Sequence, residues 1–545
     1  MKALKTLNPY FWKHKTLLFW GFLFIVASNF FNIFKVQFVG QSVDEIASHQ
    51  TFGFNKQVLI NVGIIVVSSL LTGLFTFMMR QTIIVASRRI EYELKNKIYR
   101  HYQALSLTDY KTTSIGDLMN RLSEDVVAVR MYLGPGVMYV ANLIILLTIT
   151  GIYMLKTDVE MTLWTLLPLP LLSFTIYKVS SIINKKSKTM QKSQSAISTF
   201  VQDSFSGIRI IKFFAKEAYI EHNYKQKVGN YQDKALDLAK TEAYFFTIIL
   251  LVIGLLNVAI LMIGGQKYLA GEISVGKIAD FFMYINILIW PFSMVGWVTS
   301  VNQRAAASMA RINEFLDKKS DIVNPCNDLY PITGEIEFQN VSYTYPNTGI
   351  KALDQLSFKV GAGETLAIMG KTGSGKTTIA LLLARLIDPT EGRILIDGKD
   401  LKHHNLSLYR RSLGYIPQES YLFSDTIENN IGFAVDHPTK EQIVEAAQKA
   451  DVHKNIIGFK DQYQTLVGER GVMLSGGQKQ RICIARALIK HPNILIFDDS
   501  LSALDTETEE NILKNIEKDL KKCTSILITH RESTAKKADK ILKIK

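Results

Sequence analysis

The chain has 545 residues, 48% of them hydrophobic, and a formal net charge of +14. This length is too great for one core, so two or three domains are expected. A basic balance can indicate nucleic-acid binding. Many of the excess lysines and arginines flank uncharged stretches, as in membrane proteins, so we expect no nucleic-acid partner. The three cysteines, Cys326, Cys483 and Cys523, are isolated and lack metal-binding or redox spacing.

The front half of the chain is apolar and contains all five tryptophans. Residues 1–15 mix lysines with aromatic side chains, which favours a short helix at a membrane surface. Six uncharged stretches follow, each close to the ~20 residues that cross a ~30 Å hydrocarbon layer as a helix. They are residues 16–34, 57–79, 131–155, 161–177, 243–266 and 281–303. Lys35 and Asp280 lie at the edges of such stretches and are expected to snorkel toward water.

Two long segments between these stretches, 80–130 and 178–242, are compatible with helices and rich in Lys and Arg. Because positive residues mark the cytoplasmic side, both termini and both segments are predicted to lie inside. A hairpin with ~25 helical residues in each limb would project nearly 40 Å. The predicted tips are residues 112–118 and 204–214, which could meet a cytoplasmic domain.

The back half contains a phosphate-binding motif at Gly370–Thr377, which fits G-x-x-x-x-G-K-[ST] at every fixed position. A strand-like run precedes it and a helix-forming run follows, which disfavours a simple Gly-rich turn with a surface lysine. This arrangement aims backbone N–H groups and a helix N-terminus at one point. Lys376 can reach the terminal phosphates, and the Thr377 hydroxyl can bind Mg²⁺. The predicted nucleotide-binding residues are Gly370, Thr372, Gly373, Ser374, Gly375, Lys376, Thr377 and Thr378.

Two further motifs complete the chemistry. Residues 494–498 form an apolar strand that ends in Asp498, a candidate Mg²⁺ ligand, and Asp499 follows where a base could polarise water. Residues 474–481 offer a hydroxyl, exposed amides and a helix start, which predicts a second anion site. One γ-phosphate does not need both loops. Two chains facing head to tail would use both, each closing the other's nucleotide, so a dimer is predicted.

In this order the motifs resemble those of an ATP-binding-cassette (ABC) exporter half-transporter, over nearly the whole chain. Residues 474–478, Leu-Ser-Gly-Gly-Gln, are identical to the signature sequence of that family. The resemblance implies a membrane α-helical bundle of six transmembrane helices, followed by a cytoplasmic α/β P-loop nucleotide-binding domain. The expected boundaries are residues 1–317 for the transmembrane domain, 318–334 for the linker and 335–545 for the nucleotide-binding domain.

The resemblance also implies roles around the nucleotide. Tyr345 would stack on adenine, and His530 would contact the γ-phosphate as part of the catalytic group with Lys376. Gln418 would touch Mg²⁺ beside Asp498 and relay the state of the nucleotide to the membrane hairpins.

Other implied roles are shared between two copies of the cassette. Ser475 and Gly477, with Gly476 and Gln478 in the same stretch, would bind the partner's γ-phosphate. Asp505, in residues 502–505, would cross the dimer interface. Residues 467–471 resemble the exporter-specific loop that meets the hairpins.

The chain departs from the family at Asp499, where glutamate is usual. One methylene fewer withdraws the carboxylate by ~1.5 Å, whereas a base must come within ~3 Å of its proton or water. Misplacement on that scale can cost ~100-fold in rate. The change resembles the degenerate site of heterodimeric exporters, so a heterodimer with a second half-transporter is favoured over a slow homodimer. Family members also usually continue beyond the strand-like residues 540–544, so the domain is expected to be short at its C-terminus.

The expected function is ATP-driven export or flipping of an amphipathic substrate (drug, lipid or peptide) by alternating access. Mg²⁺ and ATP are the expected cofactors, and membrane lipids and a hydrophobic or amphipathic substrate are further partners. The expected location is the inner membrane, with several spans and a cytoplasmic nucleotide-binding domain. A degenerate-site regulatory subunit or an ATP-gated channel without net pumping is the alternative. The apolar front half opposes a soluble ATPase of DNA repair.

Overall fold

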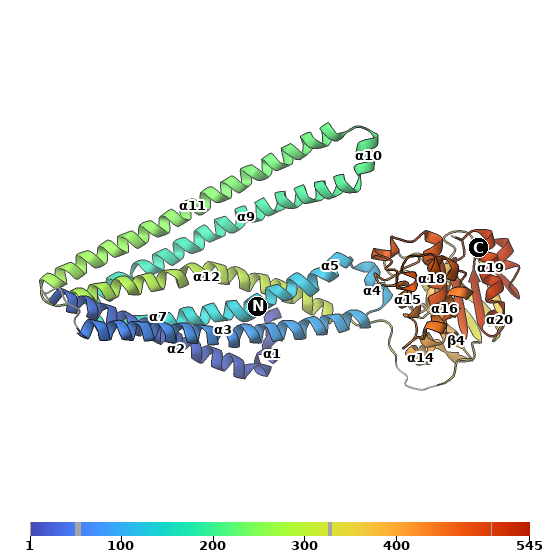
Figure 1. The fold of residues 1–545 in the computed structure, drawn as a ribbon, viewed down its shortest axis with the longest axis horizontal. Helices are drawn as coiled ribbons and strands as arrows, with labels where there is room; N and C mark the ends of the chain where they lie inside the picture. The colour runs from blue at the N-terminus through green and yellow to red at the C-terminus, as the bar shows by residue number, and fades with distance from the viewer. Residues whose placement is uncertain (1, 49–55, 325–329, 503, 545) are drawn as a thin grey trace. The chain divides into compact units, whose positions relative to one another are not determined.

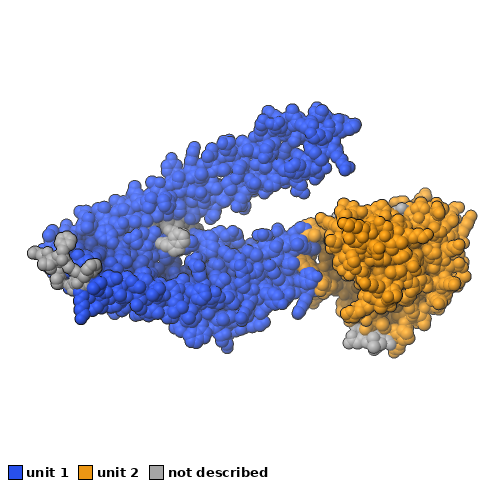
Figure 2. Space-filling view, viewed as in Figure 1, with its two compact units in different colours: residues 1–101, 116–317 blue, residues 102–115, 318–545 orange. Residues whose placement is uncertain are grey.

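The computed structural model describes residues 2–48, 56–324, 330–502 and 504–544. Cys326 and Ala503 therefore lie outside the described residues, and the predicted linker 318–334 is described only in part. The chain forms two compact units, which are coloured separately in Figure 2. The first unit comprises residues 1–101 and 116–317, and the second comprises residues 102–115 and 318–545.

The first unit is built from helices (Figure 1). It begins with a 3-10 helix η1 (Lys2–Leu7) and a short α1 (Asn8–Lys13), where a short helix was predicted. The long helices are α2 (Lys15–Ser48), α3 (Lys56–Ala104), α7 (Val137–Thr157), α9 (Pro168–Ser206), α11 (Glu217–Leu269) and α12 (Val275–Leu316). Shorter elements are α5 (Ile115–Asn120), the π-helical turns η2 (Arg121–Asp125) and η3 (Tyr132–Gly136), α6 (Val126–Met131), α8 (Val159–Leu166) and α10 (Ile208–Phe213).

A helical transmembrane domain is confirmed, but the number of spans is not. In the described part of the chain, five helical stretches are long and apolar enough to cross a membrane. They are Lys15–Ser48, Lys56–Ala104, Ile115–Thr157, Glu217–Leu269 and Val275–Leu316. The predicted stretch 161–177 is not among them, because it is divided between α8 and α9. Pro168 stands at the start of α9, a position that suits its fixed φ and missing N–H.

A close helix crossing in this unit joins the C-terminal part of α2 to the start of α12. A Cβ added to Gly276 would overlap the carbonyl oxygen of Gly40, so only glycine permits this approach. Asp44 accepts hydrogen bonds from the Gly276 N–H (2.6 Å) and the Ser274 hydroxyl (2.6 Å), and so caps α12. The prediction for Asp280 was wrong. Its side chain is 1% exposed and lies against Gly40, because the close crossing encloses it.

The two long polar segments do extend as helices. α9 and α11 lie side by side, and α10 joins them between Gly207 and Phe214 (Figure 1), within the predicted tip 204–214. The first predicted tip, 112–118, contains the interruption between α4 (Leu107–Thr112) and α5. α4 begins after Ser106, whose N–H (3.2 Å) and hydroxyl (2.9 Å) donate hydrogen bonds to the Asp109 carboxylate.

The second unit contains two β-sheets. One is antiparallel in the order β2-β1-β4-β5, from β1 (Ile336–Thr344), β2 (Lys351–Val360), β4 (Glu391–Ile396) and β5 (Lys399–Asp400). The other is parallel in the order β6-β7-β8-β3-β9, from β3 (Thr365–Gly370), β6 (Leu413–Ile416), β7 (Ile494–Asp498), β8 (Thr524–Ile528) and β9 (Lys540–Ile544). The predicted α/β fold is confirmed, and one of its two sheets is antiparallel. The short β1–β2 connection permits only antiparallel pairing.

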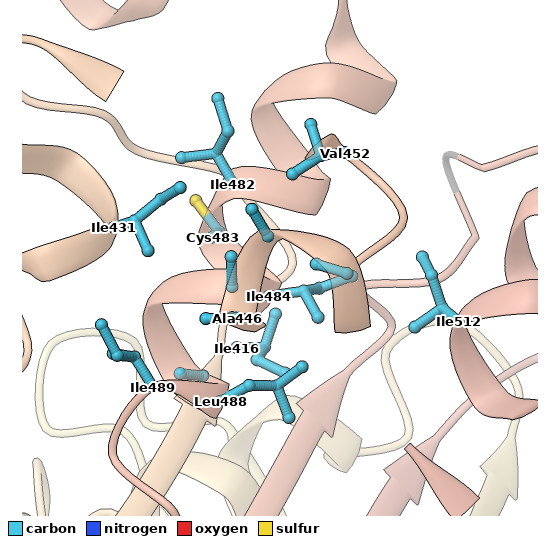
Figure 3. Close-up of a cluster of buried hydrophobic side chains, with 14 of the residues drawn as sticks. Ile416, Ile431, Ala446, Val452, Ile482, Cys483, Ile484, Leu488, Ile489 and Ile512 are labelled. Atoms are coloured by element: carbon cyan, nitrogen blue, oxygen red, sulfur yellow. The ribbon is translucent and has the colours of Figure 1, made fainter. Parts of the chain in front are cut away.

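Helices pack on these sheets and enclose two apolar clusters. They are α13 (Lys376–Leu383), α14 (Leu406–Arg411), α15 (Ile427–Gly432), α16 (Lys440–Lys449), α17 (His453–Ile457), α18 (Gly476–Leu488), α19 (Thr506–Asn515), α20 (Glu517–Leu520) and α21 (Glu532–Ala535). In one cluster, α18 contributes the buried side chains of Ile482, Cys483 and Ile484 (Figure 3). The other lies around β1, β3 and α13, and Leu107 of α4 packs against it. Both clusters hold the loops that follow β3, β7 and β8 in place.

Candidate functional site

The phosphate-binding motif forms the turn between β3 and α13, as predicted. Gly373 and Gly375 both have φ +87°, a left-handed conformation that favours glycine. A Cβ at Gly375 would also overlap the carbonyl oxygen of Ala352. The turn therefore brings backbone N–H groups to the N-terminus of α13, where an anion is stabilised.

Lys376 lies inside this turn and is only 7% exposed. Its Nζ donates hydrogen bonds to the carbonyl oxygens of Gly370 (2.8 Å) and Lys371 (2.7 Å). Burial lowers the pKa of Lys376, although the carboxylates of Asp499 and Asp498 oppose this shift. The ammonium group is thus held where a bound phosphate would need a positive charge.

Asp498 ends β7 and is 1% exposed. Thr377 Oγ1 donates a hydrogen bond to Asp498 Oδ1 (3.0 Å), and the Tyr415 hydroxyl donates one to Oδ2 (3.2 Å). Burial raises the pKa of Asp498, while these two hydrogen bonds oppose the rise. A hydroxyl and a carboxylate held together are the oxygen ligands that Mg²⁺ prefers, with phosphate oxygens and water as the others. This donor set fits Mg²⁺.

Sequence reasoning missed Tyr415. It lies 83 positions from Asp498 and reaches it because β6 and β7 pair in parallel. Nothing in the local sequence of β6 indicates which strand it pairs with, so the sequence carried no direct signal for this contact.

A cavity of about 300 Å³ collects most of the predicted site. Thr372, Gly373, Gly375, Lys376, Thr377 and Thr378 line it from the phosphate-binding turn, with Tyr345, Gln418, Asp499 and His530 around them. The Tyr345 hydroxyl lies 3.1 Å from Thr378 Oγ1. Ile350, Ala352 and Ile528 also line the cavity and were missed, although the first two follow Tyr345 closely in the chain. Their apolar side chains beside an aromatic ring suit a flat nucleobase.

Asp499 and His530 come from the ends of neighbouring strands, β7 and β8. Asp499 Oδ2 lies 3.7 Å from His530 Nε2, which is longer than a hydrogen bond. The backbone of Asp499 is left-handed (φ +50°), and its N–H donates to the Ile528 carbonyl (3.0 Å). Its other oxygen, Oδ1, is buried and has no hydrogen-bond partner in the described part of the chain. A buried acceptor of this kind would gain from a water or ligand donor.

The second predicted anion loop lies at the start of α18. Ser475 Oγ accepts a hydrogen bond from the Gln478 N–H (3.3 Å), and Gln478 Oε1 accepts one from the Ser475 N–H (3.0 Å). This is a capping box, which fixes the first turn of α18. Gly476 is exposed and Gly477 half-buried. None of residues 475–478 is among the described residues that line the cavity.

Asp505 also lies outside the residues that line the cavity. It caps α19, because its carboxylate accepts from the Thr508 N–H (2.9 Å) and hydroxyl (2.9 Å). The structure thus gives Asp505 a local role that sequence reasoning missed, although Asp before a helical run is a common N-cap.

Comparison with known proteins agrees with this arrangement. Residues 18–292 match the family described as the ABC transporter transmembrane region, and residues 353–502 match the family described as ABC transporter. The chain is 31% identical to the uncharacterized ABC transporter ATP-binding protein YknU of Bacillus subtilis, over 99% of this chain and 92% of that protein. It is 33% identical to the multidrug resistance-like ATP-binding protein MdlA of Escherichia coli, over 92% of this chain and 85% of that protein. A solved structure of a bacterial Atm1-family ABC exporter with ATP bound matches with a TM-score of 0.78 and 27% identity. The match covers 98% of this chain and 94% of the exporter chain.

Proposed function

Because the chain belongs to the ABC transporter family, in which ATP hydrolysis drives export across a membrane, we propose that it exports an amphipathic substrate as one half of a dimer. ATP-driven transport follows from the membership. The assignment of residues, substrate class and partner is our proposal. The observation that carries it is the cavity at which Lys376, Gln418, Asp499 and His530 meet.

The cavity is proposed to bind the triphosphate of ATP. Lys376 would exchange its hydrogen bonds to two backbone carbonyls for contacts with the terminal phosphates. Residues 372–378 would donate backbone N–H hydrogen bonds to the phosphate oxygens. Thr377, Asp498 and Gln418 would hold Mg²⁺, which neutralises phosphate charge when it is bound. Tyr345 would stack on adenine, beside Ile350 and Ala352.

Asp499 and His530 are proposed to act on the attacking water. The unpartnered Oδ1 of Asp499 can accept a hydrogen bond from it, and His530 can contact the γ-phosphate from the same cavity. The shorter side chain of Asp499 then limits the rate. This is the reason to propose a heterodimer, in which a glutamate-bearing partner supplies the faster site and residues 475–478 of this chain complete it.

Two features support a second cassette. Residues 475–478 and Asp505 lie at helix N-termini outside the cavity, so a second chain could use them for its own nucleotide. The tip around α10 also exposes large aromatic side chains, with Phe213 82% and Phe205 73% exposed. A monomeric soluble surface rarely leaves such a group uncovered, so the tip is proposed to dock on the nucleotide-binding unit of the partner.

The substrate is proposed to be a drug-like molecule, lipid or peptide. Relatives of the chain carry the description multidrug resistance, including one from Bacillus subtilis that is 32% identical. The long apolar helices would place the protein in the inner membrane of a bacterium, with the nucleotide-binding unit in the cytoplasm.

The proposal is tested in inverted membrane vesicles that contain the full chain. Lys376→Ala should abolish ATP turnover and ATP-dependent dye uptake, while the melting temperature of the purified protein stays close to wild type. The matched control is Lys540→Ala, which removes an exposed lysine that pairs with Glu364. Normal uptake by Lys376→Ala would refute the assigned site. Purification from native membranes then asks whether the chain co-purifies with itself or with a glutamate-bearing half-transporter.

A further inference from the structure

Arg531 follows His530 directly, yet it is not among the described residues that line the cavity. Its side chain turns to a different set of groups, which we call the Arg531 cluster. The cluster consists of Arg531, Glu509 of α19, Thr534 of α21 and the backbone carbonyls of Ser502 and Leu504.

The contacts of the cluster are numerous and directed. Arg531 Nη1 donates to Glu509 Oε2, and Nη2 donates to the carbonyl oxygens of Ser502 (3.1 Å) and Leu504 (2.9 Å). Thr534 Oγ1 donates to the second oxygen of Glu509. The Glu509 side chain is 4% exposed, so the guanidinium compensates a carboxylate that water cannot reach.

These contacts join the segment that follows Asp499 in the chain to the segment that follows His530. Ser502 and Leu504 follow Asp499 and precede Asp505, while Arg531 follows His530. Asp499 and His530 are already too far apart, at 3.7 Å, to hold each other by a hydrogen bond. The hydrogen bond from the Asp499 N–H to the Ile528 carbonyl (3.0 Å) joins the two backbones ahead of these side chains. The planar guanidinium of Arg531 adds a second link, between the segments that follow Asp499 and His530.

We propose that Arg531 is a positioning residue for ATP hydrolysis, which holds the segment after Asp499 in register with His530. The inference rests on the proposed roles of Asp499 and His530. Among the described residues, Arg531 is not one of those that line the cavity. Its effect is transmitted through the Ser502 and Leu504 carbonyls on one side and its peptide link to His530 on the other.

The decisive substitution is Arg531→Lys in the full chain, purified in nanodiscs. Lysine keeps the positive charge beside Glu509, but its single ammonium group cannot replace the fork that spans the carboxylate and two carbonyls. A displacement of about 1 Å at a catalytic group can cost ~100-fold. We expect kcat to fall at least ~10-fold, while the KM for ATP and the affinity for a fluorescent ATP analogue stay within about twofold.

Two comparisons separate positioning from simple support of the fold. Arg411→Lys changes an exposed arginine whose partner Asp436 is also exposed (76% and 84%), and it should leave kcat and KM unchanged. Glu509→Gln keeps the size and the acceptor oxygen but removes the charge, and it should lower kcat with the KM unchanged. If Arg531→Lys fails to fold, kcat and KM of Glu509→Gln test the proposal by the same criteria.

The outcomes divide cleanly. A fall in kcat alone supports the proposal, and an unchanged kcat overturns it. A parallel loss of ATP affinity, kcat and melting temperature also overturns it, because a purely structural ion pair would produce that result. His530→Ala is measured beside these variants. If it leaves kcat intact, the proposed site itself is wrong, whereas a loss with His530→Ala but not with Arg531→Lys rejects the positioning role only.

Discussion

Replacing Asp499 with glutamate tests the geometry of the cavity most directly. Asp499 Oδ2 lies 3.7 Å from His530 Nε2, roughly 0.5 Å beyond the ~3.2 Å limit of a good hydrogen bond. One added methylene advances the carboxylate by ~1.5 Å, which brings it within reach of a water shared with His530. If the short side chain limits the rate, kcat should rise by about 10-fold to 100-fold, which corresponds to ~1.4 to 2.7 kcal/mol.

The backbone opposes this gain only in part. Asp499 has φ +50°, a left-handed conformation in which aspartate is enriched and glutamate is not. Such a position costs roughly 1–3 kcal/mol for residues other than glycine, and aspartate and glutamate differ by only a part of that cost. We therefore expect the gain in placement to exceed the added strain, with a small loss in melting temperature.

The assay is steady-state ATP hydrolysis by the purified chain alone, with saturating Mg²⁺ and ATP, for wild type, Asp499→Glu and Asp499→Asn. The asparagine variant should fall below wild type, since it cannot accept a proton. ATP binding is measured separately, so that a change in occupancy is not mistaken for a change in rate. If Asp499→Glu binds ATP normally and shows no increase, the argument from side-chain length is wrong.

Two further predictions concern stability. Gly276→Ala should destabilise the purified chain by about 1–3 kcal/mol, because the new Cβ meets the Gly40 carbonyl. Gly265→Ala is the matched control, since nothing lies within 4 Å of its added Cβ, and equal shifts in melting temperature would contradict the close-packing argument. Asp505→Ala should cost about 1 kcal/mol by removing the cap of α19, whereas Asp505→Asn keeps an acceptor for Thr508 and should melt near wild type. Equal losses in the two Asp505 variants would show that the cap is not the source of the effect.

Local patterns predicted the elements that carry the chemistry. The predicted strands at 494–498 and 540–544 coincide with β7 and β9, and the phosphate-binding turn lies between a strand and a helix as expected. These features depend on short runs of apolar residues and on glycines at fixed spacing, which are visible along the chain. The α/β fold of the second unit was implied by the family resemblance that these motifs carry, and it is confirmed.

Features that depend on distant partners were missed. The antiparallel sheet follows from which strands pair, and the contact of Tyr415 with Asp498 follows from the order of strands in the other sheet. Asp280 was expected at water, because its place near the end of an apolar run gave no sign of the glycine crossing that encloses it. The Arg531–Glu509 pair joins residues 22 positions apart, with β8 between them. Nothing in the local sequence of either residue indicates the other.

The second compact unit is discontinuous along the chain, since it includes residues 102–115 as well as everything after 317. A fragment expressed from residue 318 onward would therefore lack a piece of its own fold, and the apolar surface under Leu107 would be left open to solvent. During synthesis, that piece emerges more than two hundred residues before the strands that it packs against. A nucleotide-binding unit made without residues 102–115 would thus lose the apolar contact of Leu107, so its melting temperature is expected to lie below that of the unit in the full chain.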